Sequence, residues 1–134
     1  MKKDLPNNLV EDISVAVALE GETPESRSWY VYLINRKTED LQHVLVTSKG
    51  YDVSNGKDIQ TSVLRHYIGD VSKESFAKIE PIDEALFGLT NEYWISFYVD
   101  DVIYDKKFIF LPESIVESNF LKIPILNKPG VLIG

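Results

Sequence analysis

The sequence predicts an all-β protein, an immunoglobulin-like sandwich of about seven to eight antiparallel strands. Runs rich in aromatic and β-branched residues recur along the 134-residue chain, separated by short polar turns. Within most runs the residues alternate between two faces, as they do in strands with one buried side. Almost no stretch of ten or more residues shows the 3.6-residue repeat of an amphipathic helix. A small barrel is the alternative architecture.

The clearest strand pair lies in residues 91–112. Two apolar runs meet at Asp100-Asp101, a polar break suited to a hairpin turn. With these two residues as the loop, Val99 faces Val102 and Trp94 faces Lys107. The side chains of the first strand then divide between two faces: Tyr93, Ile95, Phe97 and Val99 point one way, and Trp94, Ser96 and Tyr98 point the other.

Five further strands are expected before this hairpin, at residues 13–20, 29–35, 41–48, 61–68 and 75–82. In the first, the small residues Ser14, Ala16 and Ala18 occupy alternate positions, so a second element is expected to approach closely on that side. Asn55-Gly56 favours a tight turn, and residues 83–89 could form one helical turn between the sheets.

The chain is expected to form one domain. Residues 1–12 are polar and predict a flexible N-terminal arm, and residues 13–134 form the sandwich with an apolar C-terminal tail, 112–134. The tail combines a possible helical turn at 113–119, an apolar run at 120–126 and a predicted type II turn at 127–130. Such a tail has to pack on its own domain or on a second copy.

Composition excludes several classes of function. With 14 basic and 21 acidic residues, the net charge of −7 disfavours binding to nucleic acid or to anionic membranes. The chain has no cysteine, which excludes disulfides, thiolate nucleophiles and zinc–thiolate sites and fits a reducing compartment. No apolar run approaches the roughly 20 residues that span a bilayer. A cytoplasmic location is therefore expected.

Catalytic signatures are also missing from the sequence. The two histidines, His43 and His66, lie on separate predicted strands without the spacing of a metal-binding pair. There is no G-x-S-x-G, H-E-x-x-H or phosphate-binding glycine loop. We therefore expect a protein without a cofactor or metal, and no enzymatic activity is predicted.

Two groups of residues are candidates for binding. The first is the outward face of the hairpin, Trp94 and Tyr98 with Asp105 and Lys107 on the facing strand. A lysine over Trp94 would add a cation–π contact of roughly 0.5–1 kcal/mol, and aromatic residues beside charges are typical of protein-binding surfaces. Alternatively, the tail at 112–134 covers this face and makes it part of the core.

The second group is Tyr51, Arg65 and His66. Arg65 is expected to pair with an acid on a neighbouring strand, such as Glu80; the alternative is that its face of the strand is exposed. If these three residues instead surround a pocket between the sheets, the protein would be a small-ligand binding domain.

Four segments carry a resemblance to a known family: KGYD (49–52), TSVLRHYIGDV (61–71), FAKIEPI (76–82) and the hairpin residues 91–110. They resemble a group of small bacterial proteins without an established activity, some of which are labelled phenylalanyl-tRNA synthetase subunits. The resemblance covers most of residues 13–134 and implies no site residues. The chain shows no ATP site or class-defining arginine motif of a synthetase. The sequence therefore favours a non-enzymatic interaction module that binds a protein partner or itself.

Overall fold

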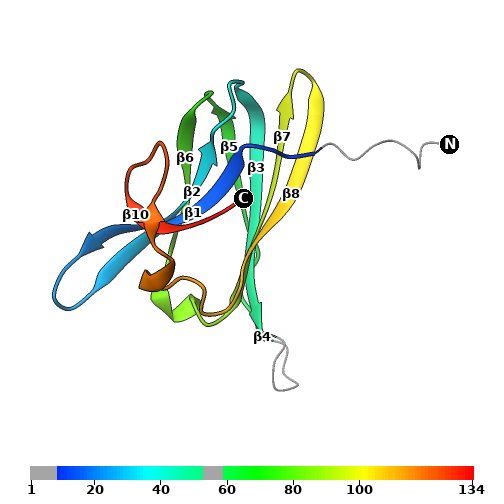
Figure 1. Ribbon diagram of the computed structural model, residues 1–134. Coiled ribbons are helices and arrows are strands. Elements are labelled where there is room, and N and C mark those ends of the chain that lie inside the picture. The colour runs from blue at the N-terminus through cyan, green and yellow to red at the C-terminus, as the bar shows by residue number, and fades with distance from the viewer. Residues whose placement is uncertain (1–8, 53–58) are drawn as a thin grey trace.

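A computed structural model describes residues 9–52 and 59–134 of the chain. Two antiparallel sheets pack face to face in an open sandwich (Figure 1), which confirms the predicted fold class. The strands are β1 (Ile13–Glu22), β2 (Arg27–Asn35), β3 (Leu41–Asp52), β4 (Ile59–Gln60), β5 (Leu64–Val71), β6 (Ser75–Ile82), β7 (Thr90–Val99), β8 (Val102–Phe110), β9 (Leu121–Lys122) and β10 (Pro129–Ile133). Two short 3₁₀ turns, η3 (Glu84–Leu86) and η4 (Glu117–Asn119), lie in the connections.

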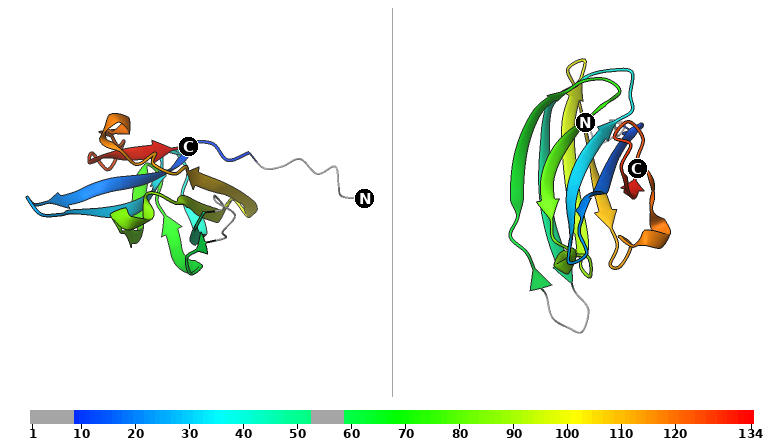
Figure 2. Two further views of the ribbon diagram at one scale, coloured as in Figure 1. Left: turned by 90° about the horizontal axis from the view of Figure 1, so that it is seen from below. Right: turned by 90° about the vertical axis from the view of Figure 1, so that its left-hand side faces the viewer.

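Sheet A has the strand order β6-β2-β1-β10-β9. Sheet B has the order β4-β3-β7-β8, and β5 pairs with β3 on the same side as β4. The chain therefore crosses between the sheets after β2, after β5, after β6 and after β8. The first three crossings follow the pattern of immunoglobulin-like sandwiches. Figure 2 shows the sheets as two layers whose strands run roughly alongside one another.

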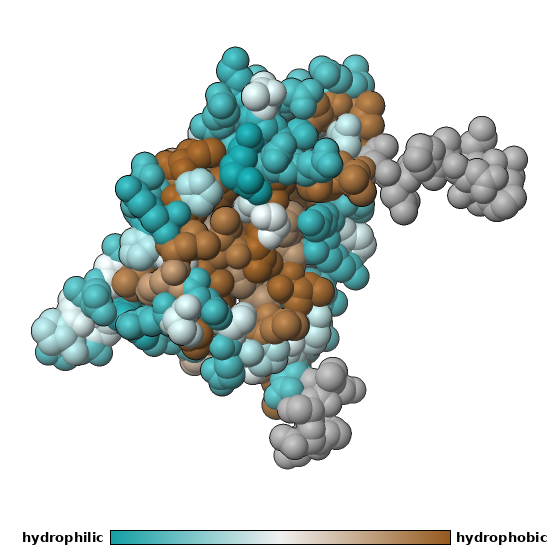
Figure 3. All heavy atoms as spheres, in the orientation of Figure 1, coloured by the Kyte–Doolittle hydropathy of each residue, from teal (hydrophilic) through white to brown (hydrophobic). Residues whose placement is uncertain are grey.

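The main core fills the space between the sheets. Alternate residues of β1 and β2 point into it, among them Val15, Val17 and Val31, and they meet Ile95 and Phe97 of β7. All of these side chains are buried. β10 also contacts β8, at the side of the sandwich that faces the viewer in Figure 3. Apolar atoms gather at the centre of this view. The partly buried Tyr104 and Ile133, one from each of these two strands, pack against the core.

The outer side of sheet A is covered by the C-terminal segment. Ile123 packs on Ala16 and Ala18 of β1 together with Tyr32 and Ile34 of β2, and all five side chains are buried. This confirms the close approach expected beside the small residues of β1. The tail thus packs on its own domain, and its last strand pairs with β1.

Polar contacts fasten this cover to the sheet. The Lys128 ammonium lies 2.7 Å from the Glu20 carboxylate, which also accepts a hydrogen bond from the Tyr32 hydroxyl. Burial alone would raise the pKa of Glu20, but hydrogen bonds from Lys128 and Tyr32 outweigh it and lower that pKa. The carboxylate therefore stays charged and holds the segment in place.

Most strand predictions agree with the structure. The hairpin has the expected register, with Val99 opposite Val102 and Trp94 opposite Lys107, and β6 has the predicted bounds. The fourth predicted strand begins three residues late, at Leu64, and the expected helical turns are the short η3 and η4. The Asn55-Gly56 turn and residues 1–8 of the predicted arm lie outside the described residues.

The type II turn predicted at 127–130 is wrong. Pro129 and Gly130 are the first residues of β10, opposite Lys122 and Leu121 of β9. The chain reverses before them, where Ile125 and Asn127 have positive φ values of 70° and 61°. Gly130 is needed for close packing, because a Cβ there would collide with the Val17 carbonyl oxygen.

Within the described residues, no helix has the length and apolar character required to span a membrane.

Candidate functional site

The outer side of sheet B is exposed and rich in aromatic and aliphatic side chains. Cross-strand neighbours lie on one side of a sheet, so the register defines this surface. We call it the open face. Its residues are Leu45, Thr47, Lys49 and Tyr51 of β3, Arg65 and Tyr67 of β5, Glu92, Trp94, Ser96 and Tyr98 of β7, and Ile103, Asp105, Lys107 and Ile109 of β8.

Several large apolar side chains of the open face are in contact with solvent. Trp94 is 44% exposed and Tyr67 is 67% exposed, and Leu45, Tyr98, Ile103 and Ile109 are exposed to comparable degrees. The alternative that the tail covers this face is therefore wrong, since the tail packs on sheet A instead.

Trp94 is held in place by two neighbours on β8. The Lys107 ammonium lies 4.8 Å from the centroid of its ring, and the indole Nε1–H donates to Asp105 Oδ2 at 3.3 Å. The expected cation–π contact is present. All four residues of the first predicted group, Trp94, Tyr98, Asp105 and Lys107, lie on the open face.

Arg65 and Tyr51 of the second predicted group lie on the same face. One row of cross-strand neighbours runs Arg65, Thr47, Trp94, Lys107. The Tyr51 hydroxyl donates to Glu92 Oε1 at 3.3 Å, and burial, together with the charge of Glu92, raises the pKa of Tyr51. The structure therefore joins six of the seven predicted residues in one surface.

His43 also belongs to this surface, as the alternation of His43, Leu45 and Thr47 along one face of the strand predicted at 41–48 indicates. Its Nδ1 lies 3.1 Å from the Tyr67 hydroxyl, and its ring meets the Tyr98 ring edge to face. A β-bulge between Gln42 and Leu45 gives His43 a positive φ of 53° and turns its side chain toward the aromatic residues. Simple alternation along the strand does not predict such a bulge.

His66, the seventh residue, points to the space between the sheets. Its Nε2 lies 2.7 Å from Glu80 Oε1. The expected Arg65–Glu80 ion pair is wrong, because Arg65 lies opposite Thr47 on the outer side, whereas His66 lies opposite the buried Val46. Glu80 is the acid that was expected to form this contact, but its partner on β5 is His66 and not the adjacent Arg65.

Glu80 is the centre of a polar cluster that links the two sheets. Its carboxylate accepts hydrogen bonds from the Ser48 hydroxyl at 2.8 Å and from the Tyr93 hydroxyl at 3.1 Å, besides its contact with His66. Burial, reinforced by the charge of Glu80, raises the pKa of Tyr93 far above its ordinary value.

A cleft of about 300 Å³ opens beside this cluster. Leu64, Ile82 and Leu86 form apolar parts of its wall, and Ser48, Glu80 and Tyr93 contribute polar groups. None of Tyr51, Arg65 and His66, the residues expected around a pocket between the sheets, lines this cleft.

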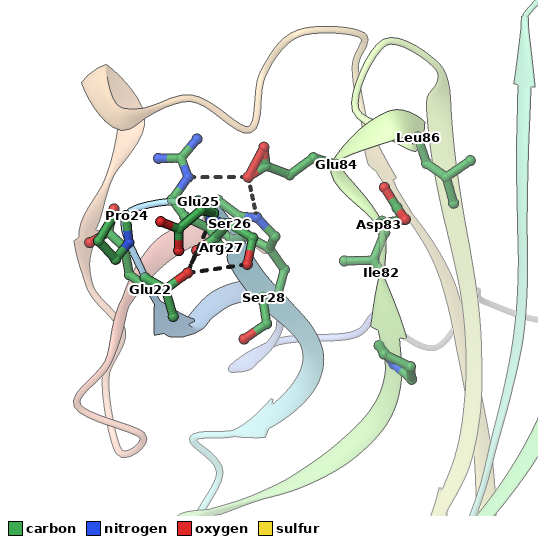
Figure 4. A pocket seen from close by; sticks show the side chains of 13 residues that line it. Glu22, Pro24, Glu25, Ser26, Arg27, Ser28, Ile82, Asp83, Glu84 and Leu86 are labelled. Atoms are coloured by element: carbon green, nitrogen blue, oxygen red, sulfur yellow. Dashed lines mark hydrogen bonds and ion pairs between the residues drawn. The ribbon is translucent and has the colours of Figure 1, made fainter.

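A larger recess, of about 960 Å³, lies between the β1–β2 turn and η3 (Figure 4). Arg27 and Glu84 point toward one another across it, with Nε and Oε1 3.1 Å apart, and Glu84 also accepts the indole N–H of Trp29. A second carboxylate, Glu117, lies 3.1 Å from Arg27. These contacts have a structural role, because they join β2 to η3 at the recess.

The terminal strands of both sheets carry features that oppose pairing with another chain. Lys106 lies opposite the buried Ile95 on the inner side of β8, with its ammonium 5.0 Å from the Phe108 ring. In β6, Pro81 lacks a backbone N–H, and a register shift interrupts the ladder with β2. Charged inward residues, prolines and bulges are common protections of sheet edges. One edge strand of each sheet, β8 in sheet B and β6 in sheet A, therefore carries such a feature.

Among residues 9–52 and 59–134, no group of three or more histidine or acidic side chains could hold a metal ion.

Comparisons with known proteins give structural similarity alone. No family model matches the chain, and no curated protein matches it in sequence. Among solved structures, it is similar to the sporulation control protein Spo0M from Bacillus subtilis, with a TM-score of 0.33 and 7% sequence identity. The match covers 76% of this chain and 49% of the Spo0M chain, so the chain spans about half the length of that protein.

Proposed function

We propose that this protein is a non-enzymatic interaction module, and that its open face docks onto a second copy of the chain. One observation carries the proposal. The middle of the outer side of sheet A is buried under the protein's own C-terminal segment, whereas the outer side of sheet B exposes Trp94, Tyr67 and other large apolar side chains across its strands. A sheet with two covered faces would have no comparable surface to offer.

The residues of the open face suit protein binding. Tryptophan, tyrosine and arginine are enriched among residues that dominate binding energy at interfaces. Trp94 is already fixed by Lys107 and Asp105, so docking would cost little additional side-chain entropy at this position. Tyr67 and Tyr98 are similarly joined through His43.

Charges are separated along the strands of this face. Arg65 and Lys107 lie in the row of Trp94, midway along the strands, and Lys49 lies farther from the β7–β8 turn, opposite the buried Glu92. Asp100 and Asp101 form that turn, and Asp70 lies at the same end, where it accepts the backbone N–H of His43. The face therefore has an acidic end at the turn and a mainly basic end, which extends to the middle of the face and includes Glu92.

This separation favours a particular arrangement of two copies. In a two-fold face-to-face complex with reversed strand directions, each basic end meets the acidic end of the other copy. The opposite arrangement, with parallel strand directions, would bring like charges together. Charge complementarity therefore supports a second copy in the reversed orientation as the occupant.

The contact should be weak and reversible. Four strands with about eight residues each present roughly 500 Å² of sheet surface per copy, which is below the ~800 Å² per partner of standard stable complexes. We therefore expect dimerisation at protein concentrations above roughly 10 µM, typical of transient complexes. A cytoplasmic location is part of the same proposal and is supported by the absence of cysteine.

The first experiment is sedimentation of the wild-type protein across concentrations. We expect the average mass to rise toward that of a dimer, and the variant Trp94→Ser/Tyr98→Ser to stay monomeric with its β-sheet circular dichroism retained. The matched control, Phe76→Ser/Leu121→Ser, removes two comparably exposed apolar side chains from sheet A and should still associate. Association that survives in the Trp94/Tyr98 variant would overturn the proposal for this face.

A charge exchange tests the charge complementarity of the contact. Arg65→Glu/Lys107→Glu makes both ends mainly acidic, and Asp70→Lys/Asp101→Lys makes both ends mainly basic, so each variant alone should dissociate. Mixing the two variants should restore a heterodimer, because a mainly acidic face then meets a mainly basic one. A mixture that remains monomeric contradicts the electrostatic contribution to the contact. A wild-type protein that is monomeric at every concentration excludes the second copy and leaves a different protein as the partner of the face.

A further inference from the structure

We propose that the cleft beside Glu80 binds a small organic cation, a primary ammonium or amidinium group carried on a short apolar body. The site lies between the sheets and is separate from the open face, so it does not depend on the function proposed above. Its volume of about 300 Å³ is at the lower end of the range typical of small-molecule pockets. A ligand of about ten heavy atoms or fewer would fit such a space.

The donors of the cleft are already used within the protein. The hydroxyl hydrogens of Ser48 and Tyr93 are both directed to Glu80. The Asn91 amide donates to the carbonyl oxygens of Leu86 and Leu89, and the Thr61 hydroxyl donates to that of Ser62. A ligand that needs hydrogen-bond donors, such as a carboxylate or phosphate, would therefore find few in the described part of the wall.

Acceptors, by contrast, remain available. Each carboxylate oxygen of Glu80 can accept two hydrogen bonds. Within the described residues, Oε2 accepts a hydrogen bond from Tyr93 alone, whereas Oε1 is shared by Ser48 and His66. The hydroxyl oxygens of Ser48 and Tyr93 have lone pairs as well. The ligand has to bring the donors, and three N–H groups of an ammonium match this set.

The charge of the cleft points the same way. The Glu80 side chain is only 13% exposed, and its one potential cationic partner among the described residues is His66. The lysine of the lining, Lys49, has its ammonium 5.7 Å from the Tyr51 ring, on the open face. A carboxylate that is mostly shielded from water interacts strongly with a cation that reaches it.

The apolar wall sets the rest of the ligand. Leu64, Ile82 and Leu86 would contact a hydrocarbon body while the cationic group meets Glu80. Leu64 is the exposed member of this group, so it lies where a ligand would enter. A strongly hydrated metal or a large polyamine would gain little from these side chains. A benzyl or short alkyl group fits better.

The test is a titration of the protein with benzylammonium, followed by backbone amide chemical shifts. We expect saturable shifts at Gly50, Leu64 and Glu80 with a dissociation constant on the order of 1 mM, reasonable for so small a ligand. Benzyl alcohol and benzoate, which share the ring but lack the positive charge, should bind at least tenfold more weakly. Equal binding of benzoate, or no saturable shift with benzylammonium, would refute the proposal.

Two variants localise the site. Glu80→Gln keeps the size of the side chain and removes its charge, and it should weaken benzylammonium binding at least tenfold. In case this variant does not fold, Leu64→Trp fills the entrance from an exposed strand position and should block binding. The matched control is Leu121→Trp, at an exposed leucine of β9 in sheet A, which should leave the affinity unchanged. Unchanged binding in Leu64→Trp places the ligand elsewhere and overturns the assignment.

Discussion

At the scale of single residues, Glu80 shows how this sandwich tolerates a largely buried carboxylate. No arginine or lysine pairs with it among the described residues; three neutral or titratable donors, from Ser48, His66 and Tyr93, satisfy it instead. Such hydrogen bonds stabilise the charged form of a carboxylate and offset part of the cost of burying it. The cluster also ties β6 of sheet A to three strands of sheet B.

Tyr93 makes this cluster sensitive to alkaline pH. Burial, then the nearby charge of Glu80, raises the pKa of Tyr93 beyond the accessible range, whereas an unfolded tyrosine ionises near pH 10. The unfolded chain therefore loses a proton that the native state keeps, and stability is full below pH 10 and falls above it. We expect this residue alone to cost about 2–3 kcal/mol of unfolding free energy between pH 10 and pH 12.

Urea unfolding as a function of pH measures this effect. Tyr93→Phe should lower stability at pH 8, because Glu80 loses a donor, but should show a flatter decline above pH 10. Tyr67→Phe, at a tyrosine that is 67% exposed, serves as the control and should decline as steeply as the wild type. An identical alkaline slope in all three proteins would contradict the raised pKa of Tyr93.

At the scale of elements, the decisive contact is that of β10 with β1. β10 pairs with β1 from Val15 opposite Ile133 to Ala18 opposite Gly130. A Cβ on Gly130 would collide with the Val17 carbonyl oxygen and press on Ile123, which covers the outer side of the sheet. The glycine therefore allows both the strand pairing and the cover.

We expect Gly130→Ala to lower the unfolding free energy by about 2–3 kcal/mol or more, as overpacking of a tight contact does. Gly88→Ala is the matched control, because its Cβ would lie 3.6 Å from the nearest atom, Glu113 Oε2, and stability should change by less than about 1 kcal/mol. Chemical denaturation of both variants and of the wild type measures these changes in unfolding free energy. Similar stabilities would mean that β10 does not need so close an approach to β1.

Local patterns along the chain predicted the elements whose contacts are local. The β7–β8 hairpin was predictable because alternation and a two-residue polar break specify both strands and their register. Pro129-Gly130 led to the wrong prediction of a turn, because proline and glycine occur both in turns and in closely packed strands. Only the contact of Gly130 with the distant Val17 distinguishes the two cases. The candidate site shows the same limit. Alternation placed Trp94 and Tyr98 together, but the bulge at His43 and the choice between Arg65 and His66 depend on strands far apart in sequence.

At the scale of the whole molecule, the two sheets differ in what they leave exposed. Sheet A has its main core on one side and the buried Tyr32 and Ile34 on the other. Sheet B shares that core but leaves its outer aromatic residues in solvent, on a protein whose net charge is −7. The net charge opposes indiscriminate association, so the proposed dimer has to form through specific contacts of the open face.

The two sheets also differ in how far apart along the chain their partners lie. Sheet B is assembled from residues 41–110, whereas sheet A is completed by a strand whose neighbour Gly134 accepts a hydrogen bond from Ser14, 120 residues away. Closing so long a loop is entropically costly and slow. In pulsed hydrogen exchange during refolding, amides of β3 and β7 should become protected before those of β1 and β10. Simultaneous protection would show that the sheets form together.

If β10 pairs with β1 late in folding, the partly folded chain exposes an additional apolar surface. Until that strand and Ile123 dock, the apolar outer side of sheet A is as bare as the aromatic side of sheet B, so the partly folded chain offers two adhesive surfaces instead of one. Aggregation should therefore compete with folding during this interval, and the risk should be greatest when many chains are synthesised at once. Docking of the C-terminal segment ends the exposure of sheet A. In the folded protein, the aromatic outer side of sheet B remains exposed.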